Sequence, residues 1–176
     1  MRCRPLAHTF KTMARIVAGL DYDFTRFEVM AFIAHIAAQR GRDILVKGYP
    51  FQREVSGVWI RAETADYIFY NNTLHPIHQT HSILHELAHP VLGHRGQSLA
   101  AALPPDFWQP GAETKPVGRL RAPALIGDDE QEREAELFVG VIQKQVLSAR
   151  RFRELYTGHS SSAVFRPYAD GMGFEA

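Results

Sequence analysis

Residues 76–93 constrain the fold more than any other part of the chain. Pro76 suits the first turn of a helix, because the N–H group that proline lacks has no partner there. Pro90 cannot donate to the carbonyl of Glu86, so we expect it to kink or end the helix just after His89. The pattern predicts a helix from about 76 to 93 that is disturbed near its carboxyl end.

This expected helix contains the run His85-Glu86-Leu87-Ala88-His89. Residues four apart on a helix lie one turn apart on the same face, so both imidazoles can reach one metal ion. Glu86 lies about 100° round the helix from His85, which lets its carboxylate meet a metal-bound water rather than the metal. The run therefore predicts a Zn²⁺ site with Glu86 as catalytic base. The alternative is a histidine-rich helix on the surface.

A catalytic zinc ion usually has three protein ligands and one open position. The third is expected from a second helix, at about 130–153, which opens with four acids: Glu130, Glu132, Glu134 and Glu136. Its inward face is marked by apolar residues, namely Leu137, Phe138 and Val141. Glu134 precedes them by three, four and seven residues and shares that face. We predict Glu134 as third ligand and Glu130 as a supporting group, with Glu132 and Glu136 facing solvent. The alternative for Glu134 is an acid favoured by the helix dipole.

Three further side chains are weaker candidates. His81 precedes His85 by one turn, so it could stabilise an oxyanion or order a ligand, although a packed, hydrogen-bonded histidine is the commoner role. Tyr70 could also donate to a negative charge at the site, but aromatic residues of strands usually belong to the core. His94 lies five residues beyond His89 and past Pro90, so we expect it to cap the helix or face solvent.

The segments before the histidine helix predict an α+β fold. A helix is expected from Thr25 to about Arg40, with a capping box at Thr25 and a stop at Gly41. Three β-like runs follow, at 43–46, 55–62 and 65–70, and the last two form a hairpin. We expect a sheet of about three strands packed on the histidine helix and further helices. The strand at 65–70 could be an edge that pairs with a peptide, unless the following insert covers it.

The 176 residues suit a single domain, expected at 25–156. Residues 95–128 are rich in proline and glycine and predict a long irregular insert. We expect a partly disordered N-terminal extension at 1–24 and a C-terminal tail at 157–176. The first residues are basic but lack the continuous apolar core of a targeting segment, and translation could start at Met1 or at Met13.

Composition narrows the class of protein. Cys3 is the one cysteine, so an intramolecular disulfide is excluded and metal ligands must be histidines and carboxylates. No apolar run reaches about 18 residues, so we expect no membrane span and a cytoplasmic protein. A net charge of +1 makes direct nucleic-acid binding an unlikely main activity.

Three segments resemble the ImmA/IrrE family of zinc metallo-endopeptidases: Ile68-Phe69-Tyr70-Asn71, His81-Ser82-Ile83-Leu84-His85-Glu86-Leu87-Ala88-His89 and Glu132-Arg133-Glu134-Ala135-Glu136-Leu137-Phe138. The resemblance covers about residues 25–150 without the insert. It implies a minimal thermolysin-like, zincin fold, with Zn²⁺ on His85, His89 and Glu134 and with Glu86 as base. It also implies cleavage of a regulatory protein, such as a separately encoded helix-turn-helix repressor.

The chain departs from the family pattern at Pro90, at Val139 and in the long separation of His89 from Glu134. We therefore expect a zinc-dependent endopeptidase and keep one alternative. In that alternative the zinc site is not hydrolytic, and the protein regulates a transcription factor by binding alone. Retained biological effect in a Glu86→Gln variant would distinguish the second function from the first.

Overall fold

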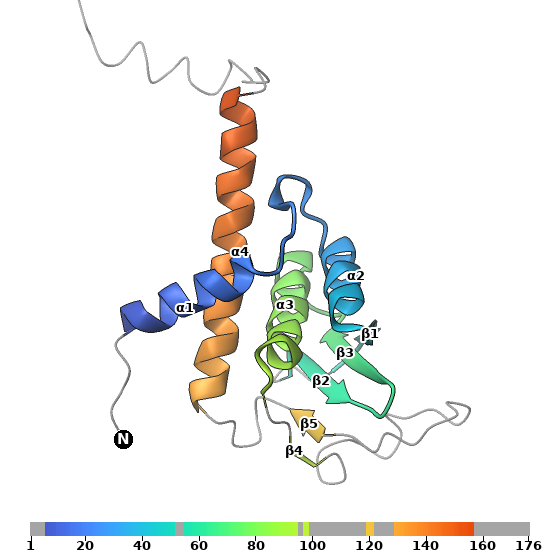
Figure 1. Ribbon diagram of the computed structural model, residues 1–176. Coiled ribbons are helices and arrows are strands. Elements are labelled where there is room, and N and C mark those ends of the chain that lie inside the picture. The colour runs from blue at the N-terminus through green and yellow to red at the C-terminus, as the bar shows by residue number, and fades with distance from the viewer. Residues whose placement is uncertain (1–5, 52–54, 95–96, 99–118, 122–128, 157–176) are drawn as a thin grey trace, which may run out of the picture.

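A computed structural model describes residues 6–51, 55–94, 97–98, 119–121 and 129–156 of the chain. Its elements follow the order α1 (Leu6–Ala18), η1 (Phe24–Arg26), α2 (Val29–Arg40), β1 (Asp43–Tyr49), β2 (Gly57–Arg61), β3 (Ala65–Asn71), α3 (Pro76–Leu92), β4 (Gln97–Ser98), β5 (Arg119–Arg121) and α4 (Asp129–Tyr156). This mixture of helices and one small sheet confirms the predicted α+β class (Figure 1).

The sheet has the strand order β1-β3-β2-β5-β4. β2 and β3 form the predicted antiparallel hairpin, while β1 lies parallel to β3 on its other side. β3 is therefore paired on both sides, and the idea that it forms a sheet edge is wrong. Two short strands, β4 and β5, come from the expected insert and extend the sheet beyond β2. Most of the insert lies outside the described residues.

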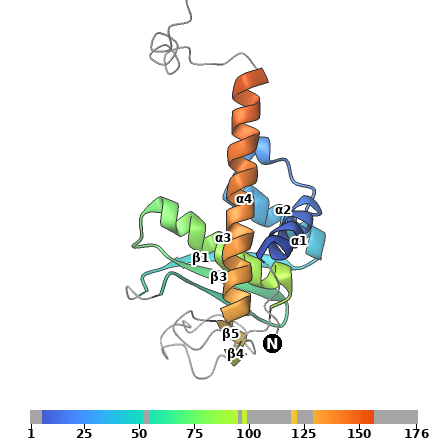
Figure 2. The ribbon, with the colours of Figure 1, turned by 90° about the vertical axis from the view of Figure 1, so that its left-hand side faces the viewer.

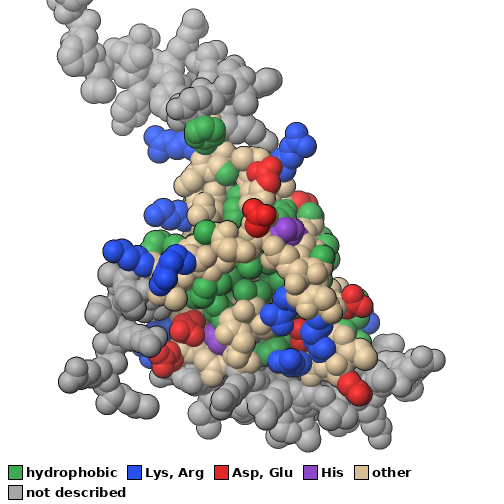
Figure 3. All heavy atoms as spheres, in the orientation of Figure 1, with side chains coloured by type: hydrophobic (Ala, Val, Ile, Leu, Met, Phe, Trp, Pro, Cys, Tyr) green, Lys and Arg blue, Asp and Glu red, His purple; other side chains and the backbone are tan. Residues whose placement is uncertain are grey.

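Helices α2 and α3 pack on the sheet, and α4 packs on α3. Figure 2 shows α4 running across α3, and both Figures 1 and 2 show its C-terminal part extending beyond the other helices and strands. The core between these elements contains large buried side chains, among them Phe32, Trp59, Leu87 and Phe138. Figure 3 shows hydrophobic side chains gathered at the centre of one face, with charged side chains around them.

The N-terminal region differs from the expectation of a partly disordered extension at 1–24. Residues Leu6–Ala18 form α1, which packs against α4. Met13 and Val17 are buried in the main core, with exposed fractions of 3% and 1%. The helix has a strongly one-sided apolar pattern, and burying that side stabilises it as part of the domain.

Helix α2 begins at Val29 rather than at Thr25, so the capping box predicted at Thr25 is wrong. The side chain of Glu28 accepts hydrogen bonds from the backbone N–H groups of Met30 and Ala31 and so caps the helix. Thr25 lies in η1, where Asp23 accepts from its N–H. The stop at Gly41 is confirmed, because this glycine has the left-handed φ of +59° that favours glycine.

Helix α3 begins at Pro76 as predicted, but it continues past Pro90 to Leu92. Pro90 lies in the last turn, so only the hydrogen bond to one carbonyl is lost there. The helix ends at Gly93, which has a φ of +71°. The N–H of Gly93 donates to the carbonyl of Pro90 at 3.3 Å, and the N–H of His94 donates to that of His89 at 2.9 Å. This pair of bonds is a Schellman motif, which turns the chain back toward the helix.

Candidate metal centre

His85 and His89 lie in the C-terminal half of α3, the helix on which α4 packs. Their exposed fractions are 9% and 1%, and their ring centroids are 5.1 Å apart at an interplanar angle of 72°. The prediction that both side chains lie on one face of the helix is confirmed. Two buried imidazoles at this separation are suited to binding one transition-metal ion.

Glu132 of α4 completes the group. One ligand atom from each of His85, His89 and Glu132 lies within 4.8 Å of the others. The contact between Nε2 of His85 and Oε2 of Glu132 measures 3.0 Å. Two imidazoles and one carboxylate fit Zn²⁺ in number and in chemical type and leave a fourth position for water. The structure thus brings a glutamate to the histidines, but a different glutamate from the expected Glu134.

The shift from Glu134 to Glu132 follows from the buried face of α4. The residues with exposed fractions of 2% or less are Ala135, Phe138, Val139, Val141 and Ile142. Leu137, used to locate the inward face, is only half-buried. Glu132 precedes Ala135 by one turn and shares its face, so it reaches the histidines. The expectation that Glu132 faces solvent is therefore wrong, whereas Glu136 is exposed as expected.

The other glutamates of α4 lie around the histidine pair. Oε2 of Glu134 lies 3.1 Å from Nε2 of His94. Oε1 of Glu136 lies 2.9 Å from Nδ1 of His85, although the Glu136 side chain is 55% exposed. Glu130 is exposed in the first turn and joins neither candidate metal group of the described residues.

Glu86 points from α3 toward the beginning of β2. Its exposed fraction is 1%, so the carboxylate lies in the interior beside the histidines. A Cβ atom placed on Gly57 would stand 2.9 Å from Cγ and 3.2 Å from Oε1 of Glu86. Only a residue without a side chain leaves that space, so Gly57 determines where Glu86 lies. The sequence did not indicate this role of Gly57.

His85 has a pKa above its ordinary value of 6.5. Burial disfavours the charged imidazolium and by itself lowers the pKa. The hydrogen bond with Glu132 and the negative charges of Glu86, Glu136 and Glu132 raise the pKa and together outweigh burial. A metal ion bound by His85 would have to displace this proton, so metal binding and protonation would compete there.

His81 and Tyr70 have different positions relative to the pair. The His81 ring stacks on the His85 ring with centroids 6.4 Å apart, and its Nε2 lies 3.4 Å from Oε1 of Glu136. His81, His85 and Glu136 form a second group that could hold a metal. Tyr70 packs against the core, with its hydroxyl beside Gly48 of β1, whereas Glu86 lies beside Gly57 of β2.

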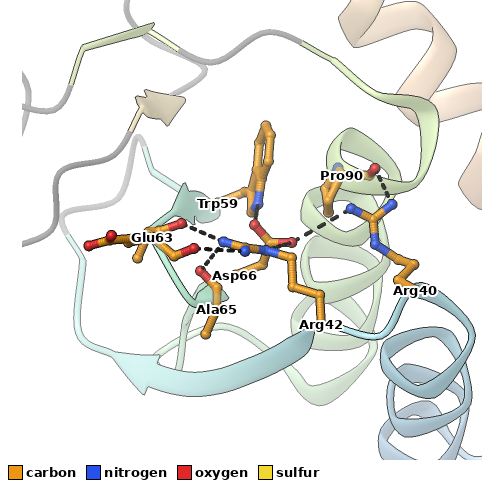
Figure 4. A network of polar contacts seen from close by, with 8 residues as sticks. Arg40, Arg42, Trp59, Glu63, Ala65, Asp66 and Pro90 are labelled. Carbon is orange, nitrogen blue, oxygen red and sulfur yellow. Dashed lines mark hydrogen bonds and ion pairs between the residues drawn. The ribbon is translucent and has the colours of Figure 1, made fainter.

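A buried carboxylate, Asp66, connects the hairpin to the histidine helix (Figure 4). Asp66 is 0% exposed and accepts from Nε of Arg42 at 3.2 Å and from Nε1 of Trp59 at 3.3 Å. Arg40 lies 3.7 Å from the same carboxylate and donates to the carbonyl of Pro90 at 2.6 Å. Arg42 also donates to hairpin carbonyls, those of Ala62, Glu63 and Ala65.

Trp59 connects this hydrogen-bond network to the candidate metal centre. Its ring stacks on that of His89, with centroids 6.1 Å apart and an interplanar angle of 10°. Trp59 was expected to be a packing residue, and its burial agrees with that expectation. The contact with His89 was missed, although an acid inside the apolar strand Ala65–Asn71 is a sequence signal for a buried polar network.

Comparison with protein-family models, with curated proteins and with solved structures found no match for this chain. Within the part of the chain that the structure describes, no helix combines the length and the apolar character needed to cross a membrane. A functional proposal therefore depends on the residues of the site.

Proposed function

We propose that this protein is a zinc-dependent endopeptidase with a zincin-like fold, similar to the ImmA/IrrE family. The observation that carries the proposal is the convergence of His85, His89 and Glu132 from two crossing helices, with Glu86 next to His85 on α3. A histidine pair alone could be a surface feature. Its burial against a carboxylate from a distant part of the chain supports a metal centre.

Each side chain has a defined part in this proposal. Bound zinc would supply Lewis-acid chemistry, polarising the substrate carbonyl and acidifying a water molecule. His85, His89 and Glu132 would hold the ion. Glu86 takes a proton from the attacking water as the new carbon–oxygen bond forms, and passes it to the amide nitrogen. The carbon–nitrogen bond then breaks, so the products are a free acid and a free amine.

The substrate that we propose is a regulatory protein, such as a separately encoded helix-turn-helix repressor. The burial of Glu86 and His89, each 1% exposed, favours one second candidate. In it, the metal centre is structural and the protein regulates a transcription factor by contact. The two functions differ in whether the biological effect needs the carboxylate of Glu86.

The test combines zinc analysis with cleavage of an unstructured protein, such as β-casein, followed by mass spectrometry. We expect Glu86→Gln to keep zinc and lose cleavage, because the amide cannot accept the proton. Glu132→Ala should lose zinc, while Glu130→Gln, on the same helix, should keep zinc and activity. Wild-type cleavage by Glu86→Gln, or full zinc content in Glu132→Ala, would show that the proposal is wrong.

A further inference from the structure

His94 contacts the Nδ1 side of the His89 ring. It is only 8% exposed, and its Nδ1 lies 2.8 Å from Nδ1 of His89. Its other nitrogen, Nε2, lies 3.1 Å from Oε2 of Glu134. The turn at Gly93 produces this arrangement, because it folds the chain back and bonds the N–H of His94 to the carbonyl of His89. A continuous polar chain thus runs from Glu134 through His94 to His89.

With His94 neutral, the chemistry of the three groups fixes the direction of the hydrogen bonds. A carboxylate only accepts, so Nε2 of His94 must carry the proton that it donates to Glu134. A neutral imidazole has one N–H group and one lone pair, so Nδ1 of His94 accepts. Nδ1 of His89 then donates, and the lone pair of His89 is on Nε2. In this tautomer, Nε2 of His89 is the nitrogen whose lone pair can bind a metal.

We propose that His94 and Glu134 are positioning residues that hold His89 in the tautomer and orientation needed to bind zinc. The inference rests on the proposed zinc site, and it gives Glu134 a role other than that of ligand. Partners behind metal-binding histidines commonly fix the tautomer and the ring plane in this way. The stacked ring of Trp59 restricts His89 further, since it covers one face of the imidazole.

His85 has a simpler form of the same arrangement. Its Nδ1 lies 2.9 Å from Oε1 of Glu136, so a carboxylate can accept that N–H directly and leave Nε2 for the metal. For His89, a second histidine stands between the imidazole and the carboxylate. The direction of the hydrogen bonds from His89 through His94 then depends on Glu134. Its side chain is 37% exposed, so it can be changed without opening the core.

Variants of the full-length protein test this direction of the hydrogen bonds. Zinc affinity is measured by competition with a chelator. His94→Leu should bind zinc about 10–100-fold more weakly, as for other partners behind metal ligands. His94→Asn should recover most of that loss, because its amide oxygen can accept from Nδ1 of His89. A lysine at 134 donates where glutamate accepts, so Glu134→Lys should turn the N–H of His94 toward His89 and weaken binding.

Glu130→Lys is the matched control for Glu134→Lys, because it makes the same charge change one turn earlier on α4. We expect Glu134→Lys to bind zinc at least about tenfold more weakly than Glu130→Lys, because mutation of the partners of metal-binding histidines commonly lowers metal affinity by this amount. The stability of both variants is measured without metal, so that weaker zinc binding is not confused with unfolding. The absorption spectrum of the cobalt-substituted protein should change in Glu134→Lys only, since it reports ligand geometry.

Three results would overturn the inference: wild-type zinc affinity in His94→Leu, no recovery in His94→Asn, or equal affinities for the two lysine variants. If His94→Leu does not fold, the comparison of Glu134→Lys with Glu130→Lys still tests the inference. A wild-type protein that binds no zinc would remove the proposed function and this inference together. Zinc binding that is indifferent to His94 and Glu134 would remove this inference alone.

Discussion

The position of the Glu86 side chain depends on the absence of a side chain at Gly57. The carboxylate is buried against β2 at Gly57, where a Cβ would also come within 3.2 Å of the carbonyl oxygen of Phe69. That oxygen belongs to the hairpin backbone and cannot move easily, so an added methyl group must displace Glu86. Here a missing side chain positions a reactive group, and the motif that contains Glu86 gives no sign of this.

If the proposed function is right, Gly57→Ala should lower peptidase activity by about 10–100-fold while zinc remains bound, because small displacements of a catalytic group have effects of this size. Gly140→Ala is the control. Gly140 is an exposed glycine of α4 with space around it, so alanine should stabilise the helix by about 1 kcal/mol and leave activity unchanged. Equal activities of the two variants and the wild type would show that Gly57 does not position Glu86.

Helices and strands predicted from local patterns are confirmed where local chemistry decides them. The hairpin around Glu63 and the stop at Gly41 are examples, because turn residues and a left-handed glycine act over a few positions. The choice between Glu132 and Glu134 depended instead on which side of α4 meets α3. The apolar residues from Ala135 to Ile142 of that helix span a wide arc, so the pattern alone did not fix the rotation of α4.

Short strands paired over long distances could not be predicted. β5 has three residues and pairs with Trp59, Ile60 and Arg61, about sixty positions earlier in the chain. Pairing of this kind depends on the tertiary fold rather than on periodicity. The same reason applies to His94, since its contact with His89 depends on the turn after α3 and its contact with Glu134 depends on the position of α4.

At the level of elements, Asp66 joins β3 to the start of β1 and the end of α3. Asp66→Asn should lower the free energy of unfolding by about 2–3 kcal/mol, because it leaves Arg40 and Arg42 without the buried charge they face. The loss is at the small end for a buried pair, since the arginine side chains are 27% and 19% exposed. Urea denaturation measures it, with Asp43→Asn on the exposed start of β1 as control. Equal losses in both variants would contradict this role.

At the level of the whole molecule, the proposed metal binding and the folding of the domain involve the same acidic cluster. Glu132 and Glu136 both contact His85, and in metal-free protein a proton on His85 relieves their mutual repulsion. Under the proposed function, zinc would replace that proton and supply positive charge at the same place. The packing of α3 against α4 would then depend both on pH and on metal.

The pH dependence of the metal-free protein follows from the raised pKa of His85. A raised pKa means that the folded state binds the proton more tightly than the unfolded state, so the stabilisation is complete below pH 6.5 and disappears as pH rises through the folded-state pKa. With a chelator present, the difference in unfolding free energy between wild type and His85→Gln should therefore shrink from pH 5.5 to pH 9. Glu132→Gln should reduce this pH dependence, since its carboxylate is the main favourable partner of the imidazolium. A difference that grows with pH would mean that burial outweighs the acids and that His85 is held neutral.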